Sequence, residues 1–292
     1  MVPDVLVVGA LHLDVIVTAP HLPGRDETLM GTAVAYAFGG KGGNQAAAAA
    51  RMGARTAMAG RVGRDAFAVT VLAALDAAGV DRTGVRATEG ATGMSAAMVD
   101  AAGDYAAVVV SGVNRDIRAE DVALAPDLPV LMLQNEIPDA VNAALIARLG
   151  PATTLILNAA PARHVSAAIL GRTDILIVNR VEAAMLTGQS PDVLDPDAAI
   201  HALSALGPKA VIVTLGADGV VASGFAAPAF RVAVISTHGA GDAFTGALAA
   251  RIAAGEDLQT ACRFAQAAAA LHVSIPPDQR AAITPAQVRA LL

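Results

Sequence analysis

Residues 236–248 read Ser-Thr-His-Gly-Ala-Gly-Asp-Ala-Phe-Thr-Gly-Ala-Leu and carry the clearest signal in the chain. The apolar run 232–235 predicts a strand before them, and the run 243–254 predicts a helix after them. Small residues at a helix start leave backbone N–H groups open to an anion, and the helix dipole favours negative charge there. Asp242 can take a proton from an alcohol while the amides of 239–241 hold developing phosphoryl charge. The stretch therefore suits transfer of phosphate to a hydroxyl.

Length and composition bound the class of protein. A chain of 292 residues with 55% apolar residues is long enough for one large α/β domain or two small ones. It has no apolar run near the ~18 residues of a membrane span, and residues 1–4 lack the basic region of a signal peptide. The single cysteine, Cys262, rules out an intramolecular disulfide. These features predict a cytoplasmic protein that does not bind membranes.

The charge balance argues against a nucleic-acid partner. The net charge is −6, aromatic residues make up 3% of the chain, and there is no tryptophan. Proteins that bind nucleic acids generally need a basic face, often with aromatic side chains on which bases stack. Neither feature is evident, so no nucleic-acid partner is expected.

Apolar runs that resemble buried strands alternate with helix-like segments along most of the chain. Strands are predicted at 5–9, 130–133, 154–157, 175–178 and 211–214, and helices at 140–149, 165–170, 183–186 and 198–206. This alternation predicts a doubly wound, three-layer α/β fold with a mostly parallel sheet, whose ligands bind at the carboxyl ends of the strands.

Some extended segments break this rhythm. They lie at about 14–19, 28–38, 93–99 and 105–111, and the last two flank a turn that contains Gly103 and Asp104. We expect them to form a small β-sheet lid over a cleft within one kinase-like domain spanning 1–292. The alternative is that they are extra edge strands of the main sheet.

A second glycine-rich stretch, 38–45, reads Phe-Gly-Gly-Lys-Gly-Gly-Asn-Gln and leads into an alanine-rich helix. Its glycines let the backbone approach a polar ligand, and Lys41 and Asn44 offer donors to hydroxyls. It does not have the spacing of a P-loop. Taken alone, it is explained equally well by a tight strand–helix connection.

The two glycine-rich motifs, in this order and about 200 residues apart, resemble the ribokinase-like carbohydrate kinases, the PfkB family. The likeness covers nearly the whole chain, and the pattern at 39–45 with the Ala-Pro-Ala-Arg stretch at 160–163 is most similar to the ribokinase branch. The other matching stretches are 9–14, 133–136, 179–182 and 214–216.

The resemblance assigns roles to the first motif. It implies that Asp242 is the catalytic base, which deprotonates a primary hydroxyl of a sugar for in-line attack on the γ-phosphorus of ATP. Gly239, Ala240 and Gly241 match the anion hole. The alternatives are that Asp242 is only a helix N-cap and that the glycines form an ordinary strand–helix turn.

The resemblance also implies a sugar site, in which Asp14 accepts bonds from two adjacent hydroxyls. The other implied contacts are His12, Gly40, Lys41, Asn44 and Glu136. Glu136 read alone is also typical of a solvated loop charge before Pro138.

The nucleotide side is implied in the same way. Asn179 and Glu182 match the family's Asn-x-x-Glu pattern, and such a pair can orient the water ligands of Mg²⁺ beside the triphosphate of ATP. An Asn followed three residues later by Glu is also a helix-capping pattern. Thr214 and Gly216 resemble the strand end that admits adenosine, and Gln266 aligns near the adenine.

The chain departs from the family pattern near the first motif. Where the family commonly has an aspartate that helps hold a monovalent cation, this chain has Ser236, and the later cation loop is replaced by 274–280. We therefore expect that potassium does not activate the protein, and Arg280 is a candidate source of positive charge in its place. His12 stands where ribokinase-like proteins commonly have Asn, and His238, just before the anion hole, is read as a half-exposed loop residue.

The expected function is ATP-dependent phosphorylation of ribose or a similar furanose. The alternatives are a nucleoside or other sugar-like acceptor, which the substitution at His12 keeps open, and a non-catalytic sugar- or nucleotide-binding protein, which Ser236 and 274–280 suggest. Extended lid segments leave sheet edges that a second copy could cover, and relatives are often dimers, so a homodimer through the lid is also expected.

Overall fold

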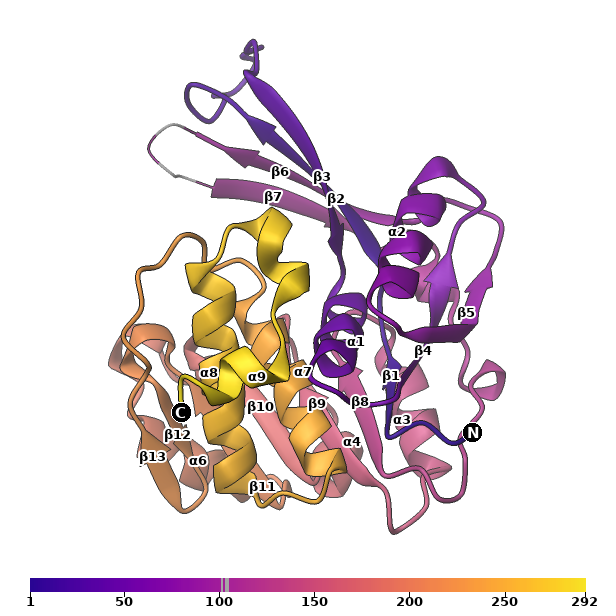
Figure 1. Ribbon diagram of the computed structural model, residues 1–292, viewed down its shortest axis with the longest axis vertical. Helices are drawn as coiled ribbons and strands as arrows, with labels where there is room; N and C mark the ends of the chain where they lie inside the picture. Colours follow the sequence, from indigo (N-terminus) through magenta and orange to yellow (C-terminus); the bar gives the residue numbers. More distant parts are fainter. Residues whose placement is uncertain (101, 103–104) are drawn as a thin grey trace.

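A nine-stranded sheet forms the body of the protein in the computed structural model, which describes residues 1–100, 102 and 105–292. Its strand order is β13-β12-β11-β10-β9-β8-β1-β4-β5, and neighbouring strands from β11 to β5 run parallel (Figure 1). The strands are β1 (Val5–Val8), β4 (Thr56–Val62), β5 (Asp81–Ala87), β8 (Val130–Gln134), β9 (Thr154–Asn158), β10 (Ile175–Asn179), β11 (Ala210–Thr214), β12 (Val220–Ala222) and β13 (Phe225–Ala227).

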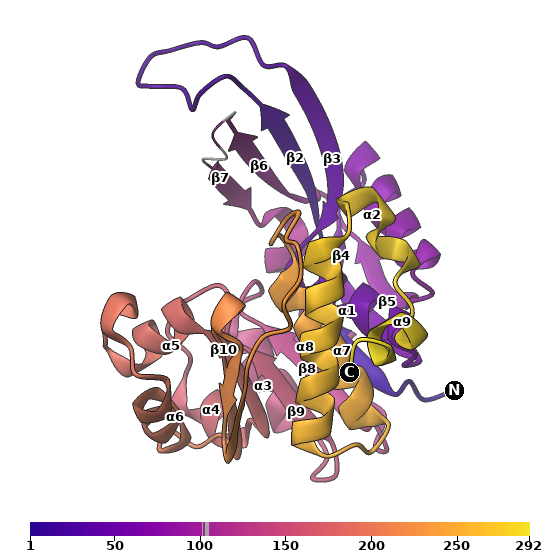
Figure 2. The same ribbon diagram turned by 60° about the vertical axis from the view of Figure 1, so that its left-hand side comes forward.

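Helices cover both faces of this sheet (Figures 1 and 2). Successive residues of a strand point to opposite faces, so Val5 and Val7 of β1 pack into one core while Leu6 and Val8 pack into the other. The first face is covered by α1 (Lys41–Arg51), α2 (Ala66–Ala77), α7 (Ala240–Ala253), α8 (Leu258–Ser274) and α9 (Pro285–Arg289), and the second by α3 (Asp139–Ala147), α4 (Ala167–Arg172), α5 (Arg180–Thr187) and α6 (Pro196–Ser204). The predicted doubly wound, three-layer fold is confirmed.

A separate four-stranded sheet projects from one end of the body (Figures 1 and 2). Its order is β3-β2-β6-β7, and β6 joins β2 in parallel while the other pairs are antiparallel. The strands are β2 (His12–Thr18), β3 (Ala33–Gly39), β6 (Gly93–Val99) and β7 (Tyr105–Val110). The extended segments therefore form their own sheet, the lid sheet, and not extra edge strands of the body; Gly103 and Asp104 lie outside the described residues.

The strand predicted at 232–235 is wrong. These residues have no regular secondary structure, and the N–H of Ile235 bonds the carbonyl of Val273 at the end of α8. The side chains of Val234 and Ile235 are more than half exposed, so the apolar run has no sheet to join. The strand that leads towards the first motif is instead the short antiparallel edge strand β13.

The helices α1 and α7 pack unusually closely, and both carry predicted site residues. A Cβ added to Gly246 would lie 2.5 Å from the carbonyl oxygen of Gln45 and 2.6 Å from the Cβ of Ala48. Only small residues allow such an approach, which explains why α1 needs its alanine run. The contact brings the starts of the two helices to one place.

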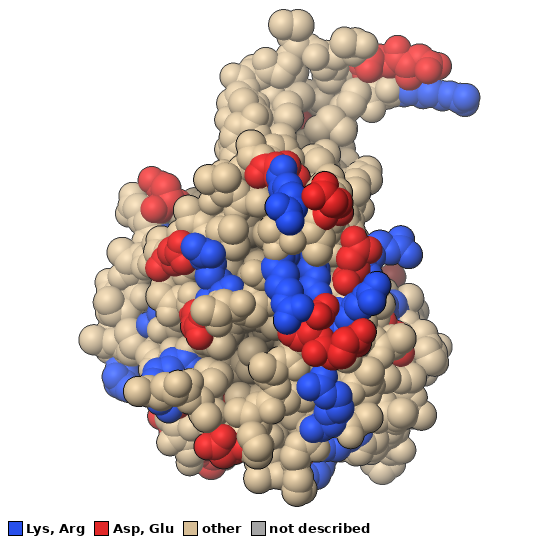
Figure 3. Space-filling view, turned by 90° about the vertical axis from the view of Figure 1, so that its right-hand side faces the viewer, with Lys and Arg blue, Asp and Glu red and all other residues tan. Residues whose placement is uncertain are grey.

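The molecular surface carries mixed charge. Figure 3 shows basic and acidic side chains interspersed on the side of α2 and β5, where Arg82 pairs with Asp76 and Arg86 with Asp121. No helix in the described part of the chain is both long and apolar enough to cross a bilayer.

Candidate active site

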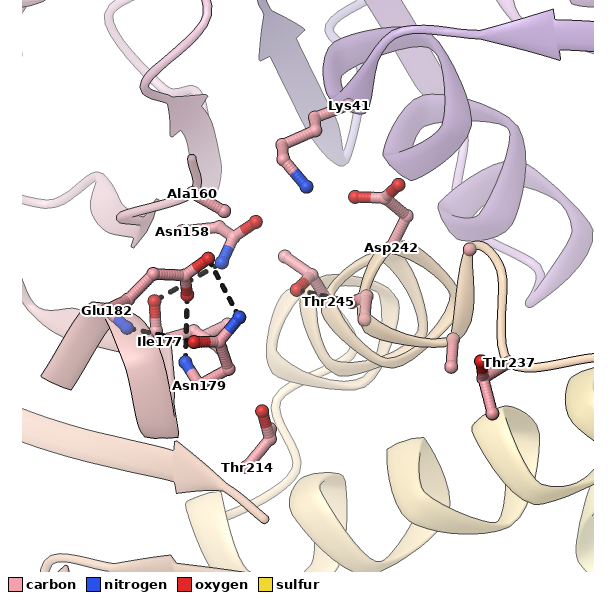
Figure 4. A pocket seen from close by; sticks show the side chains of 13 residues that line it. Lys41, Asn158, Ala160, Ile177, Asn179, Glu182, Thr214, Thr237, Asp242 and Thr245 are labelled. Atoms are coloured by element: carbon pink, nitrogen blue, oxygen red, sulfur yellow. Dashed lines mark hydrogen bonds between the residues drawn. The ribbon is translucent and has the colours of Figure 1, made fainter. Parts of the chain in front are cut away.

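A pocket opens at the carboxyl ends of β9, β10 and β11, where a parallel sheet is expected to bind its ligands (Figure 4). The starts of α1 and α7 form its other wall. Predicted site residues that line it are Lys41, Asn179, Glu182, Thr214, Gly239, Ala240, Gly241 and Asp242. The two glycine-rich motifs therefore meet in one pocket, although they are far apart in sequence.

The carboxylate of Asp242 is buried in this pocket, with only 8% of the residue exposed. The side-chain amides of Gln45 and Asn44 donate to its two oxygens, over 2.9 Å to Oδ1 and 3.3 Å to Oδ2. Within the described part of the chain it forms no ion pair within 4 Å. Asp242 is thus held by neutral donors, which leaves its charge available for a ligand.

The start of α7 is open to an anion. Gly239 is the N-cap, with φ of 77°, and Asp242 is the third residue of the helix, so Asp242 is not the N-cap that the alternative reading required. Among the described residues, the N–H groups of Gly239 and Gly241 donate to no backbone carbonyl. Exposed amides at a helix start attract negative charge, so the stretch has the properties of an anion hole.

Lys41 supplies the positive charge of the pocket. Figure 4 shows its side chain and that of Asp242 extending towards one another across the cavity. Burial opposes the charge of Lys41, but the carboxylates of Asp242, Glu136 and Glu182 outweigh it, and the pKa of Lys41 is raised. The amine therefore stays protonated, facing both the base and the phosphate side of the pocket.

Glu136 is tied to the same lysine. Its Oε2 accepts the backbone N–H of Lys41 over 2.7 Å. Burial raises the pKa of Glu136 to about 7, although the hydrogen bond and the charge of Lys41 oppose the shift. Glu136 is therefore not a solvated loop charge but a half-buried carboxyl at the start of α1.

Asp14 and His12 lie at the base of the lid sheet, on β2. The hydroxyl of Ser95 donates to Oδ1 of Asp14 over 2.6 Å, and Nε2 of His238 lies 3.9 Å from Oδ2. His12 is buried, and burial lowers its pKa although the charge of Asp14 opposes the shift. Among the described residues, Nε2 of His12 has no hydrogen-bond partner. Gly40, the N-cap of α1, has φ of 83°, and a side chain there would collide with the carbonyl of Ala10.

Asn179 and Glu182 form a complete capping box at the start of α5. Oε1 and Oε2 of Glu182 accept the side-chain and backbone N–H groups of Asn179 over 3.0 and 2.8 Å, and Oδ1 of Asn179 accepts the N–H of Glu182. Burial raises the pKa of Glu182, and the charge of Asp242 adds to the shift. Asn179 and Glu182 therefore cap α5 and also line the pocket.

These oxygens fit a hydrated Mg²⁺ and not a protein-only metal cage. No cluster of three or more His, Cys, Asp or Glu side chains suited to a metal exists among the described residues. Mg²⁺ usually keeps several waters and takes further oxygens from phosphates, so the two buried carboxylates that line the pocket, Glu182 and Asp242, fit an ion that is bound through its waters.

Two predicted nucleotide contacts lie outside this pocket. Gly216 begins a short 3₁₀ turn after β11 and has open space where a side chain would project. Gln266 on α8 is buried, and its amide donates to the carbonyl of Ala227 over 3.2 Å. Their contact with adenosine stays a prediction.

Sequence reasoning missed the residues that hold the base. Gln45 is fully buried, and its side-chain NH₂ group donates to both Asp242 and Asn158, over 2.9 Å to each. The side-chain oxygen of Gln45 accepts a hydrogen bond from the side-chain amide of Gln134 over 2.8 Å. The sequence does contain a feature that indicates this role of Gln45: it follows Asn44 and is the one large polar residue among the small buried residues of α1. Thr237 and Thr245 also line the pocket.

Comparisons with known proteins agree with this geometry. The family model "pfkB family carbohydrate kinase" matches residues 2–283. The chain is 34% identical over 279 residues to ribokinase of Bacillus subtilis, and the match covers 92% of both chains. It is 30% identical over 284 residues to deoxyribokinase of Salmonella typhi, across 93% of this chain and 92% of that one. The structure of Arabidopsis thaliana ribokinase with ribose and ATP superimposes with a TM-score of 0.90, 30% identity and coverage of 100% and 99%.

Proposed function

Because this chain belongs to the pfkB family of carbohydrate kinases, we propose that it uses ATP to phosphorylate ribose or a similar furanose on a primary hydroxyl. One observation carries the proposal: a buried carboxylate, Asp242, sits beside the unpaired amides of Gly239 and Gly241 and faces Lys41. A base, an anion hole and a cation in one pocket are the groups that phosphoryl transfer to an alcohol requires.

The chemistry follows from this arrangement. Asp242 accepts the proton of the sugar's primary hydroxyl as the oxygen attacks the γ-phosphorus, and the bond from that phosphorus to the bridging oxygen breaks, so its electron pair leaves with ADP. The donors on Asp242, Gln45 and Asn44, keep both carboxylate oxygens oriented. The amides of Gly239 and Gly241 bind the charge that develops on the transferred group.

The sugar lies at the base of the lid sheet in this proposal. The carboxylate of Asp14 accepts hydrogen bonds from hydroxyl groups of the sugar ring. Asn44, whose side-chain amide donates to Asp242, positions the reacting hydroxyl beside that base. Lys41 donates from the opposite side. The position of Glu136 does not depend on a sugar, because the backbone N–H of Lys41 already donates to its carboxylate over 2.7 Å.

The triphosphate of ATP lies between α5 and α7. Glu182 and Asn179 would hold the water ligands of a Mg²⁺ ion, and the ion would neutralise phosphate charge. Thr214 at the end of β11 lies on the nucleoside side of the same pocket. We infer no need for potassium, because the backbone carbonyl of Ser236 already accepts from the guanidinium of Arg280 over 2.9 Å.

A coupled assay of ADP release tests the proposal with a panel of ribose, 2-deoxyribose, fructose phosphates, adenosine and pseudouridine. We expect sugar-dependent turnover with ribose or a near relative, and loss of it in the Asp242→Asn variant. Absence of ADP release above background with every acceptor of the panel would favour the non-catalytic alternative.

The second candidate acceptor is 2-deoxyribose or a nucleoside. The buried Nε2 of His12 has no partner among the described residues, and a neutral imidazole offers a different donor and acceptor pattern from an asparagine. A relative named deoxyribokinase at 30% identity also supports this candidate. The ratio of kcat/KM for ribose and 2-deoxyribose separates the two.

A homodimer through the lid sheet is also proposed. The outer edges of β3 and β7 have no strand partner in the order of the sheet. Apolar side chains on these strands are more than half exposed: Val34, Tyr36, Val108, Val109 and Val110. Figure 3 shows the lid as largely uncharged except at its tip. Sedimentation velocity of the unaltered chain and of Tyr36→Glu tests the proposal, and a monomer in both would contradict it.

A further inference from the structure

The side chain of Arg280 is buried behind the anion hole, with 7% of the residue exposed. Its guanidinium donates to three backbone carbonyls: Nη2 to Ser236 over 2.9 Å, Nη1 to His238 over 2.9 Å and Nε to Ile275 over 3.2 Å. Two of these carbonyls belong to the stretch 236–239 that leads into α7. One side chain thus fixes two peptide groups of the loop that precedes the catalytic helix.

The planarity of the peptide group transmits this contact to the pocket. In a trans peptide the C=O and the following N–H point in opposite directions, so fixing the carbonyl of His238 also fixes the N–H of Gly239. That N–H is one of the unpaired amides of the anion hole, and Gly239 lines the pocket. The carbonyl of Ser236 is related in the same way to the N–H of Thr237, which also lines the pocket.

The other described contacts of this loop are few. Nε2 of His238 lies 3.9 Å from Oδ2 of Asp14, and the N–H of His238 donates to the hydroxyl of Ser236 over 3.4 Å. The loop is in no strand, and the backbone N–H groups of Ile235 and Ser236 at its start both donate to the carbonyl of Val273. His272 adds one contact, because its Nε2 lies 2.9 Å from the carbonyl oxygen of His238. Burial lowers the pKa of His272, and the charge of Arg280 adds to the shift, so the imidazole beside the guanidinium stays neutral.

The charge of Arg280 is not cancelled locally. Among the described residues no carboxylate lies within 4 Å of its guanidinium, unlike Arg61 or Arg172, which pair with Asp121 and Asp174. Its partners are the three carbonyl oxygens and Nε2 of His272, which lies 3.0 Å from Nη1. The dipoles of the carbonyls at 236 and 238 continue through their peptide groups to the N–H groups on the pocket side. A buried cation behind these amides therefore strengthens them as donors to a phosphate.

We propose that Arg280 is a positioning residue for phosphoryl transfer, which orients and polarises the amides of Thr237 and Gly239 towards the γ-phosphate. The inference rests on the proposed function, since it names what prepares the anion hole of that same site. It assigns a role to a residue outside the pocket.

Three variants test this role: Arg280→Ala, Arg280→Lys and the matched control Arg251→Ala. Arg251 is also buried, on the far end of α7, and donates to a backbone carbonyl, that of Met52, over 2.7 Å. The control thus removes another buried arginine that bonds a backbone carbonyl, at the end of α7 away from the pocket, although Arg251 also pairs with Glu256 over 3.4 Å. Arg280→Lys keeps the positive charge but loses the guanidinium group that bonds two carbonyls at once. This variant provides the test if Arg280→Ala does not fold.

The first measurement is nucleotide affinity by calorimetry, with ADP and with the β,γ-imido analogue of ATP as probes. Arg280→Ala should weaken binding of the analogue about tenfold and leave the affinity for ADP little changed, because only the analogue carries the γ-phosphate that the amides bind. Arg251→Ala should change neither. Equal affinities of Arg280→Ala and the unaltered chain for the analogue would overturn the inference, and this measurement does not depend on turnover.

The second measurement is steady-state kinetics with guanidinium added back. We expect kcat of Arg280→Ala to fall about 100-fold with little change in the KM for the sugar, and added guanidinium ion to restore at least part of it. Arg280→Lys should lie between the two. A loss of thermal stability alone, with kcat equal to that of Arg251→Ala, would show that Arg280 is merely structural. Absence of sugar-dependent turnover in the unaltered chain would contradict the proposed function instead.

Discussion

The side-chain amide of Gln45 donates to Oδ1 of Asp242 over 2.9 Å, from the neighbouring helix α1, which starts at the same wall of the pocket as α7. The same amide group donates to Asn158, so both of its hydrogens are used, and its carbonyl oxygen accepts from Gln134. The base is therefore held by a polar chain that spans α7, α1 and two central strands of the sheet. A carboxylate fixed in this way needs no reorientation when the hydroxyl arrives.

Replacing Gln45 by methionine should lower kcat about tenfold and also lower stability, because Asn158 and Gln134 lose their buried partner. Steady-state kinetics and thermal melting measure the two effects. Gln259, which is exposed on α8, is the control, and Gln259→Met should change neither. Full activity in Gln45→Met would mean that Asp242 is oriented by Asn44 alone.

Asp242→Asn should reduce turnover about 100-fold or more, with a modest change in sugar affinity, because the amide has the shape of the carboxylate but cannot accept the proton. Single-turnover kinetics and sugar calorimetry measure the two quantities. Turnover close to that of the unaltered chain would refute the assignment of the base.

Gly239→Ala should reduce turnover, because φ of 77° disfavours a side chain and the new Cβ would lie 3.0 Å from Nε2 of His272. Gly255 offers the matched control, since it has φ of 85° at the end of α7 but open space around it. Both variants should lose about 1 kcal/mol of stability from backbone strain, and only Gly239→Ala should lose activity. Equal kcat values would argue against an anion hole at this helix start.

The stability of the unaltered chain should fall relative to that of Glu136→Gln as the pH rises. Burial raises the pKa of Glu136 from its ordinary value of 4.5 to about 7, so the folded chain holds this proton more tightly than the unfolded chain. The resulting stabilisation is complete below pH 4.5 and is lost as the pH rises through about 7. Melting temperatures of both proteins between these limits measure the difference, and parallel curves would contradict the shift.

Activity should be the same in potassium and in tetramethylammonium buffers of equal ionic strength. Arg280 already bonds the carbonyls of Ser236 and His238, so these oxygens are not free to bind a cation. Coupled assays in the two buffers compare kcat directly. A strong potassium requirement would show that a cation binds elsewhere beside the anion hole.

The sequence was sufficient for the parts of the molecule that depend on local pattern. Continuous apolar runs such as 175–178 predict buried parallel strands, and the structure places β10 there. The strands β4, β5, β12 and β13 were not predicted. The strand β5 lies at the sheet edge and has exposed and half-buried residues such as Asp81 and Arg82, so it lacks the continuous apolar run of a buried strand. Burial by a neighbouring strand, not the composition of the segment, makes such a stretch extended.

Some residues of the candidate site could likewise be predicted from local sequence, and others could not. Motif glycines and the acidic and basic side chains beside them could be located in the sequence, and Asp242 and Lys41 do meet in the pocket. The supporting contacts could not, because Gln45 and Asn158 acquire their roles only from partners distant in the chain. For Arg280 the sequence suggested a positive charge near the anion hole, but not the backbone carbonyls that its side chain bonds. A pattern of residue types does not encode which of two buried amides will face a carboxylate.

The close contact of α1 with α7 at Gly246 has a consequence for biosynthesis. Asp242 and the glutamine that orients it are separated by 197 positions, so the ribosome releases one long before the other exists. A nascent polypeptide that lacks α7 already has every described strand of the lid sheet and of the main sheet, but it lacks Asp242. Under the proposed function, the chain can therefore become competent for phosphoryl transfer only after residue 242 has been translated.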